Sequence, residues 1–147
     1  MGYSRAALFF VLKGRIMFYG CETAPEEVKK LYNDLKKCWC AETCAPRMRG
    51  GWSKENPALG QCSVTAFLAQ DIFGGEVWGV PLGDGNCHCF NVVSGAEFDL
   101  TSEQFPAGSV DYSDRTLQSR GEHFAKAEKY ERYLLLRARL AESRANN

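Results

Sequence analysis

Three features of the sequence predict an α+β fold. A buried helix is expected after Gly60, because apolar side chains recur there at helical spacing. Short strands follow between residues 76 and 100, where Asp84-Gly85 and Ser94-Gly95 mark turns. A long amphipathic helix is expected from Gly121 to Ser143. The sequence therefore predicts helices packed against a small antiparallel sheet.

Composition limits the class of protein. The chain has 147 residues, enough for one domain with a real core, and its 45% hydrophobic content excludes a disordered chain. Eighteen basic and eighteen acidic side chains cancel, so no nucleic-acid partner is indicated. The seven cysteines are an odd number, which favours reduced thiols in a cytoplasm over a disulfide framework.

The first twenty residues are predicted to be an N-terminal extension before a single domain over residues 21–147. The apolar run from Ala6 to Leu12 is too short to span a bilayer, so no membrane association is expected. It is followed by Lys13 and Arg15 and by no small-residue cleavage site, unlike a secretory signal peptide.

A first amphipathic helix of about four turns is expected near residue 26. The stretch Thr23-Ala24-Pro25-Glu26 has the capping-box pattern. One face of the helix would carry the apolar residues Val28, Leu31, Leu35 and Cys38. The following residues, 39–52, contain Pro46, Gly50 and Gly51 and are expected to form a loop.

The stretch from Asn56 to Gly75 is expected to hold the central buried helix. Its helical spacing is set by Val64, Phe67, Leu68, Ile72 and Phe73. Gly74 is expected to end the helix with a positive φ. Cys62 would lie in the first turn, where unpaired N–H groups and the helix dipole favour a thiolate.

The strands are expected at residues 76–80, 87–93 and 96–100. If Ser94-Gly95 is a two-residue loop, Val92 faces Glu97, and His88 and Asp99 become diagonal neighbours on one face. A three-residue loop would turn His88 to the other face. A His–carboxylate hydrogen bond therefore depends on this register.

The end of the chain predicts a loop and then one helix. Residues 107–120 read as loop, after a single turn at residues 101–104. The helix from Gly121 to Ser143 has acidic residues early and arginines late, as the dipole prefers. His123, near its start, is expected to be an ordinary surface residue.

These positions predict a catalytic triad. Cys62 would be the nucleophile, His88 the base, and Asp99 the group that orients the imidazole and stabilises its charged form. The oxyanion would be bound by the Cys62 backbone N–H and by the side-chain amide of either Gln61 or Asn56. The alternatives are structural: a buried cysteine, a core histidine with satisfied hydrogen bonds, and an aspartate that caps the next turn.

The chain resembles the YunG-like family of small bacterial proteins. Two stretches carry the resemblance: Trp52-x3-Asn56-Pro57-Ala58-x-Gly60-Gln61-Cys62-x2-Thr65-Ala66-x3-Gln70-Asp71-x2-Gly74-Gly75 and His88-x2-Asn91-x3-Gly95-x3-Asp99-Leu100-Thr101-x2-Gln104-Phe105. The ending Arg132-Tyr133-x-Leu135-Leu136 also resembles the family. The resemblance implies a fold more than a reaction.

The order of Cys, His and Asp is also similar to that of transglutaminase-like and papain-like enzymes. This looser resemblance implies a core of that type and a triad of Cys62, His88 and Asp99. It implies hydrolysis or transfer at an amide, ester or isopeptide carbonyl of a peptide or small molecule, without a cofactor. The papain group has Gln six residues before its cysteine, whereas this chain has Asn56 there.

Two other functions remain open at this point. The protein could be a binding or regulatory protein on the same fold, without turnover. It could also be a zinc-stapled interaction module, because Cys38-x-Cys40-x3-Cys44 and Cys87-His88-Cys89 offer possible ligands. No Cys-x2-Cys pair occurs, and neighbours on a strand point to opposite faces, so no metal site is expected. Cys87 and Cys89 are instead expected to be packing thiols.

Overall fold

The computed structural model describes residues 17–147 and confirms the α+β class. The helices are α2 (Glu26–Lys36), α3 (Cys62–Phe73), α4 (Arg120–Phe124) and α5 (Ala127–Ala145). The strands are β1 (Glu76–Pro81), β2 (Cys87–Val93), β3 (Ala96–Phe98) and β4 (Thr116–Leu117). Short 3-10 helices are η1 (Ala41–Thr43), η2 (Pro46–Gly51) and η3 (Ser102–Gln104).

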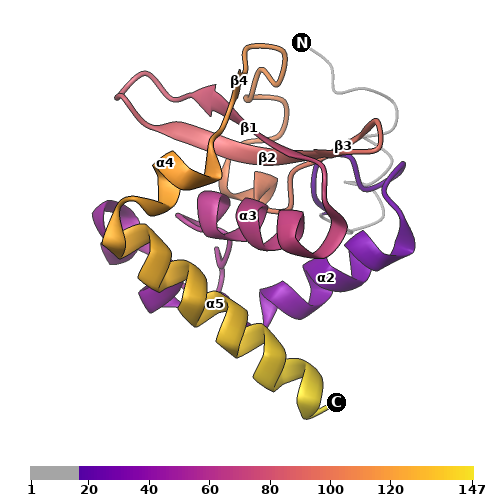
Figure 1. Cartoon of the computed structure of the whole chain (residues 1–147), viewed down its shortest axis with the longest axis vertical. Helices are drawn as coiled ribbons and strands as arrows, with labels where there is room; N and C mark the ends of the chain where they lie inside the picture. Colours follow the sequence, from indigo (N-terminus) through magenta and orange to yellow (C-terminus); the bar gives the residue numbers. More distant parts are fainter. Residues whose placement is uncertain (1–16) are drawn as a thin grey trace.

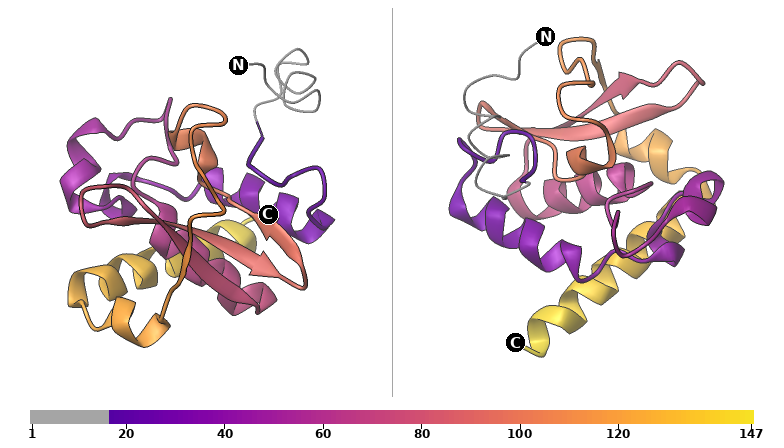
Figure 2. Two further views of the ribbon diagram at one scale, coloured as in Figure 1. Left: turned by 90° about the horizontal axis from the view of Figure 1, so that it is seen from above. Right: turned by 180° about the vertical axis from the view of Figure 1, so that it is seen from behind.

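The elements form layers around α3. The four strands pair antiparallel in the order β3-β2-β1-β4. Helix α3 lies against one face of this sheet, and α5 lies on the far side of α3 (Figure 1). The view from behind in Figure 2 shows the same order of layers. The opposite face of the sheet is covered by the segment after β3, where Phe105 packs on His88 and Tyr112 on Phe90.

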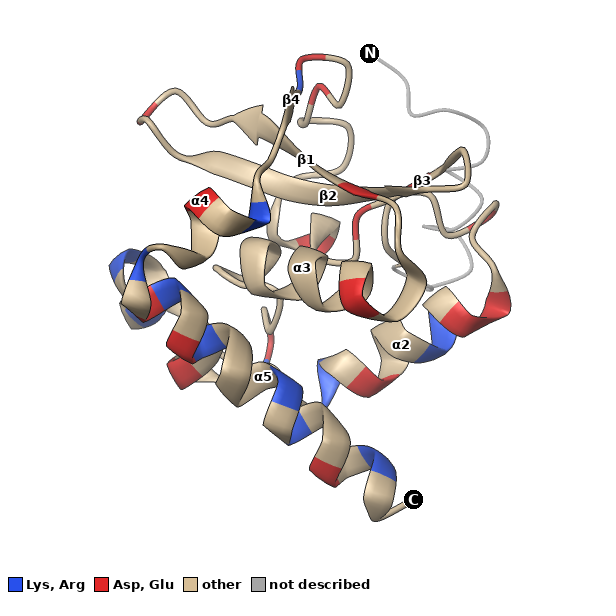
Figure 3. Cartoon of the chain, in the orientation of Figure 1, with Lys and Arg blue, Asp and Glu red and all other residues tan. Residues whose placement is uncertain are grey.

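Helix α3 is the buried helix that the sequence predicts. It begins at Cys62, and its C-cap is Gly74 with φ 78°. Val64 and Phe67 are fully buried, but Ile72 is 42% exposed, so the apolar face is narrower than expected. Figure 3 shows α3 almost without charged residues, whereas acidic and basic residues alternate along α5. The burial of α3 on both sides explains its composition.

The predicted hairpin register is confirmed. Val92 pairs with Glu97 and Val93 with Ala96, and the loop residues Ser94 and Gly95 have φ 50° and 81°. Strand β3 ends at Phe98, two residues earlier than predicted. At the next residue the Asp99 backbone N–H donates to Tyr19 O, so the chain forms an isolated bridge with the N-terminal segment.

Tyr19 belongs to a segment that packs onto the domain. Phe18 is 1% exposed and contacts the Tyr32 ring at a centroid distance of 4.9 Å. Residues 17–20 of the predicted N-terminal extension thus contribute to the core and to the sheet edge. The rest of that extension, including the apolar run over residues 6–12, lies outside the described residues.

The prediction for the first helix was wrong in two details. Helix α2 has 11 residues, about three turns, and ends before Cys38. Its N-cap is Pro25, and no side chain caps it. Thr23 Oγ1 donates to Gly20 O over 3.4 Å, so the predicted capping box does not form.

The prediction of a single C-terminal helix was also wrong. The chain breaks between α4 and α5 at Lys126, whose φ and ψ of −84° and 111° are not helical. The break lets Phe124 pack between Phe67 and Tyr133, at centroid distances of 5.2 and 4.8 Å. Strand β4 lies in the predicted loop and pairs with β1 through only two residues. Among residues 17–147, no helix has both the length and the apolar character that crossing a bilayer requires.

Candidate active site

His88 and Asp99 form a buried pair. His88 Nε2 lies 2.5 Å from Asp99 Oδ2, and both side chains are at most 1% exposed. His88 and Asp99 are thus diagonal neighbours on one face, as the two-residue loop predicts. Phe105 stands edge-on against the imidazole, at a centroid distance of 4.7 Å, and keeps water from this side of the ring.

Both Asp99 carboxylate oxygens accept further hydrogen bonds. Oδ1 accepts hydrogen bonds from the backbone N–H and the hydroxyl of Thr101, at 3.1 and 3.3 Å. Tyr112 donates its hydroxyl to Oδ2 over 2.6 Å. No sequence pattern indicates Tyr112, which lies in a loop. The predicted turn after Asp99 could have indicated Thr101.

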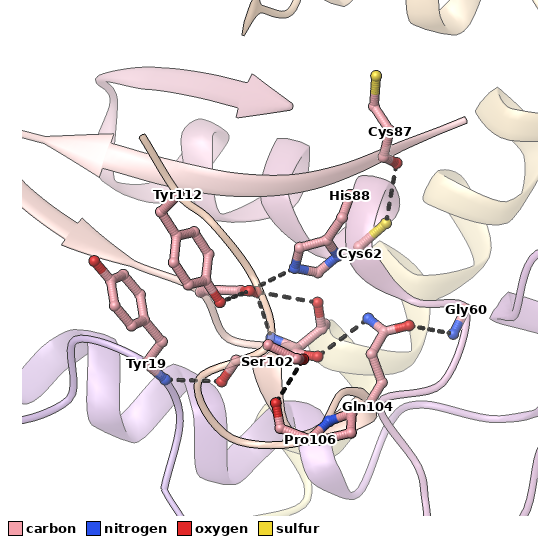
Figure 4. A network of polar contacts seen from close by, with 12 residues as sticks. Tyr19, Gly60, Cys62, Cys87, His88, Ser102, Gln104, Pro106 and Tyr112 are labelled. Atoms are coloured by element: carbon pink, nitrogen blue, oxygen red, sulfur yellow. Dashed lines mark hydrogen bonds and ion pairs between the residues drawn. The ribbon is translucent and has the colours of Figure 1, made fainter. Parts of the chain in front are cut away.

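Cys62 lies at the start of α3, beside the ring of His88. Figure 4 shows its sulfur near the side of the imidazole that faces away from Asp99. The thiol donates a long hydrogen bond to Cys87 O, at 3.9 Å, and the residue is partly exposed. His88 Nδ1 is buried and has no hydrogen-bond partner among residues 17–147. The structure therefore brings together Cys62, His88 and Asp99.

The three groups shift the pKa values of His88 and Cys62 in opposite directions. Burial lowers the pKa of His88, but the Asp99 charge and hydrogen bond, together with Cys62, outweigh burial and raise it from 6.5 to about 10. The interactions with Cys89 and with His88 lower the pKa of Cys62 well below 9.0, against the effect of burial. At neutral pH this favours a thiolate beside an imidazolium.

The α3 N-terminus supplies free backbone donors next to the sulfur. The first N–H groups of a helix have no helical partner. No side chain caps α3. The Cys62 N–H can therefore bind an oxyanion formed at a carbonyl attacked by the thiolate.

The two side-chain candidates for the oxyanion site lie in different surroundings. Gln61 is fully buried, and its Nε2 donates to Cys40 O over 3.0 Å. Asn56 is partly exposed, and its backbone N–H donates to Ser53 O. A second donor from Asn56 or Gln61 stays a prediction.

The prediction for His123 was wrong, because it is not an ordinary surface residue. Its ring packs on Phe67 at a centroid distance of 4.8 Å, and its Nε2 is buried with no hydrogen-bond partner in the part of the chain that the structure describes. Burial lowers its pKa from 6.5 to about 4. His123 is thus a neutral neighbour of the site that the sequence did not indicate.

The cysteines do not gather around a metal. Over residues 17–147, no group of three or more His, Cys, Asp or Glu side chains could hold a metal ion. Cys38 and Cys44 are buried separately, and Cys89 is buried against α3. Cys87 is exposed, so the expectation that it is a packing thiol was wrong.

The sequence of this domain matches a known family. The family model described as YunG protein matches residues 27–145, from the second residue of α2 to the end of α5. The chain belongs to the YunG family. It is 38% identical over 73 residues to a Bacillus subtilis (strain 168) protein titled "Uncharacterized protein YunG". The match covers 50% of this chain and 58% of that relative, and no solved structure matches the chain.

Proposed function

We propose that this YunG-family protein is a thiol-dependent acyl hydrolase or acyltransferase with a papain- or transglutaminase-like core. The observation that supports the proposal best is the 2.5 Å contact between His88 and Asp99, with Cys62 on the other side of the ring. A buried carboxylate fixes the tautomer and stabilises the charge of a histidine that activates a thiol. The substrate class is an amide, ester or isopeptide carbonyl.

The proposed reaction has two halves, acylation of Cys62 and release of the acyl group, and His88 transfers a proton in each. The Cys62 thiolate adds to the carbonyl carbon, and the oxyanion is stabilised by the Cys62 N–H at the start of α3. His88 then gives its proton to the leaving amine or alcohol, and a thioester forms on Cys62. Water or an amine attacks the thioester after His88 takes its proton, which releases the acid or the transferred product. Asp99 keeps the imidazole oriented throughout.

The test uses p-nitrophenyl acetate, a small activated ester. We expect a burst of nitrophenolate and an acetyl group on Cys62, detected by mass spectrometry of the intact chain and its peptides. Cys62→Ala should abolish the burst. Cys87→Ala is the matched control, because Cys87 is exposed and lies at the same end of β2 as His88.

A second measurement needs no substrate. Iodoacetamide at about pH 6 should alkylate Cys62 well before the other thiols, because only a thiolate reacts fast. Equal labelling of Cys62 and Cys87, or acetylation at Cys87 alone, would refute the proposal. It would favour a binding or regulatory protein on the same fold.

A further inference from the structure

The Cys62 site contains a second thiol, that of Cys89. Successive residues of a strand point to opposite faces, so Cys89 points away from His88 and toward α3. Cys89 is 4% exposed and forms an apolar cluster with Ala66, Phe67 and Val77. Cys62 packs against this cluster from its partly exposed position. The sulfur of Cys62 thus lies between the imidazole and a buried thiol.

The alignment of α3 with β2 places the two cysteines level with each other. Asn91 Nδ2 donates to Ala66 O over 2.8 Å, and both side chains are buried. Asn91 is two residues after Cys89, about 6.6 Å along a strand, and Ala66 is four residues after Cys62, about 6 Å along a helix. The same spacing on both elements brings Cys89 beside Cys62.

The other end of α3 shows in which direction the helix runs relative to β2. A Cβ on Gly75, just after α3, would lie 2.4 Å from Val92 O near the end of β2. Helix α3 and strand β2 therefore run in the same general direction, and Cys62 and Cys89 both lie toward their N-terminal ends. The interaction between the two thiols has opposite effects on them: it lowers the pKa of Cys62 and raises that of Cys89.

From this arrangement we infer that Cys89 is a resolving thiol, which converts a Cys62 oxidised by a hydroperoxide into a reversible Cys62–Cys89 disulfide. The Cys62 thiolate attacks the outer peroxide oxygen, the O–O bond breaks, and an alcohol or water leaves after taking up a proton. The product on Cys62 is a sulfenic acid. The Cys89 sulfur then attacks the Cys62 sulfur, the S–O bond breaks, and water leaves with the Cys89 proton. Two thiols are oxidised and one hydroperoxide is reduced.

The disulfide protects the nucleophile. A sulfenic acid without a nearby thiol is oxidised further to a sulfinic acid, which is irreversible in most proteins. Once the disulfide forms, Cys62 is not oxidised further, and an external dithiol can reduce the disulfide back to the two thiols. While the disulfide is present, Cys62 cannot act as the nucleophile in acyl transfer. The inference rests on the reactive Cys62 thiolate of the proposed function, but not on acyl transfer itself.

Cys87 is the competing thiol and provides the control. It is two residues before Cys89 on the same strand, and its carbonyl contacts Cys62. Figure 4 shows its sulfur pointing away from Cys62. Cys87→Ala should therefore leave the disulfide unchanged, whereas Cys89→Ala should abolish it.

The experiment treats the full reduced chain with an excess of hydrogen peroxide, because oxidation of a thiol to the sulfinic acid consumes two equivalents, and blocks the remaining thiols with N-ethylmaleimide in urea. Trypsin has no site between Lys54 and Arg115, so chymotrypsin is used to separate Cys62 from the peptide that holds both Cys87 and Cys89. Fragmentation of the linked peptide on either side of His88 then shows which of these two cysteines is bonded and which carries N-ethylmaleimide. We expect a Cys62–Cys89 linked peptide, removed by dithiothreitol. In Cys89→Ala we expect loss of the link and sulfinic acid on Cys62, with no recovery by dithiothreitol.

Each other result overturns the inference. A Cys62–Cys87 link, or sulfinic acid on Cys62 of the unmutated chain with Cys89 still blocked by N-ethylmaleimide, would do so. The measurement on the unmutated chain does not depend on whether Cys89→Ala folds. Rapid alkylation of reduced Cys62 without any disulfide would refute the resolving thiol alone, whereas slow alkylation would refute the proposed function as well.

Discussion

Tyr112 donates its hydroxyl to Asp99 Oδ2 over 2.6 Å, the same oxygen that contacts His88. The Tyr112 ring is stacked on Tyr19 at a centroid distance of 3.9 Å and meets the edge of Phe90 at 5.0 Å. The N-terminal segment at Tyr19 and strand β2 at Phe90 thus hold the Tyr112 phenol against the Asp99 carboxylate. Tyr112 is a positioning residue, since it acts on the site through Asp99.

Replacing Tyr112 with Phe removes this donor and keeps the ring. We expect the free energy of unfolding to fall by about 1.5–3 kcal/mol, the range for a hydrogen bond to a charged group. Urea denaturation measures the change. Tyr130→Phe is the control, because Tyr130 is 44% exposed and makes no side-chain hydrogen bond in the described structure. Equal effects of the two substitutions would contradict the role of the Tyr112 hydroxyl.

Asp99→Asn tests the charge at the same place. The amide keeps the size of the side chain, but it removes the charge that raises the pKa of His88 and can stabilise the wrong tautomer. We expect the rate of acyl-enzyme formation to fall by a factor on the order of 10²–10⁴. Stopped-flow release of nitrophenolate measures it. A loss below about tenfold would argue that the carboxylate has only a structural role.

The contacts of Asp99 show what the sequence could predict. The alternation of β2 and the two-residue turn at Ser94-Gly95 fix which side chains share a face, so the His88–Asp99 pair follows from local rules. Tyr112 does not, because its loop has no periodicity and is placed by aromatic stacking on distant residues.

The same difference between local patterns and long-range contacts explains which helices were predicted correctly. Apolar spacing and the glycine at residue 74 were enough to predict α3, which is buried on both sides. The break at Lys126 was not predictable from the pattern, since both α4 and α5 continue an amphipathic repeat. The break lets Phe124 pack between Phe67 and Tyr133, a tertiary contact that the repeat does not encode. Strand β4 has only two residues, too few for any alternation.

Gly60 controls the entry of the chain into α3. Its φ is +70°, and an added Cβ would lie 2.4 Å from Cys44 Sγ and 3.1 Å from Ala45 N. Its N–H donates to Gln104 Oε1 over 3.2 Å, and Gln104 Nε2 donates to Thr101 O, next to the Asp99 site. A displaced Gly60 would therefore disturb both Cys62 and the segment that holds Asp99.

Gly60→Ala should lower the free energy of unfolding by about 2–4 kcal/mol, since strain at a positive φ adds to overpacking. Gly83→Ala is the matched control: Gly83 has φ +83°, but nothing lies within 4 Å of an added Cβ. It should show only the backbone strain, about 1 kcal/mol. Thermal unfolding of both variants gives the comparison. If Gly83→Ala costs as much as Gly60→Ala, the contact with Cys44 is unimportant.

The opposite pKa shifts of Cys62 and His88 make a prediction for the pH dependence of stability. His88, with its pKa raised from 6.5 to about 10, stabilises the fold fully below pH 6.5 and loses this effect as the pH rises toward 10. Cys62, with its pKa lowered from 9.0, stabilises the fold above pH 9.0 and loses this effect as the pH falls. Between pH 6.5 and 9.0 the folded pair holds one proton on His88 and the unfolded pair holds one on Cys62. The two slopes therefore cancel.

Cys62→Ala removes the contribution of Cys62 to the pH dependence and leaves that of His88. Asp99 still holds a proton on the folded His88, whereas the unfolded His88 releases its proton above pH 6.5. The stability of the variant should therefore fall with rising pH, by up to about 1.4 kcal/mol per pH unit relative to the unmutated chain. Urea denaturation at intervals between pH 6.5 and 9.0 measures the slope. Cys87→Ala should keep the slope of the unmutated chain, because Cys87 is exposed and is not part of the pair. Parallel slopes for Cys62→Ala and Cys87→Ala would mean that Cys62 and His88 do not share a proton, and the thiolate–imidazolium pair would have to be abandoned.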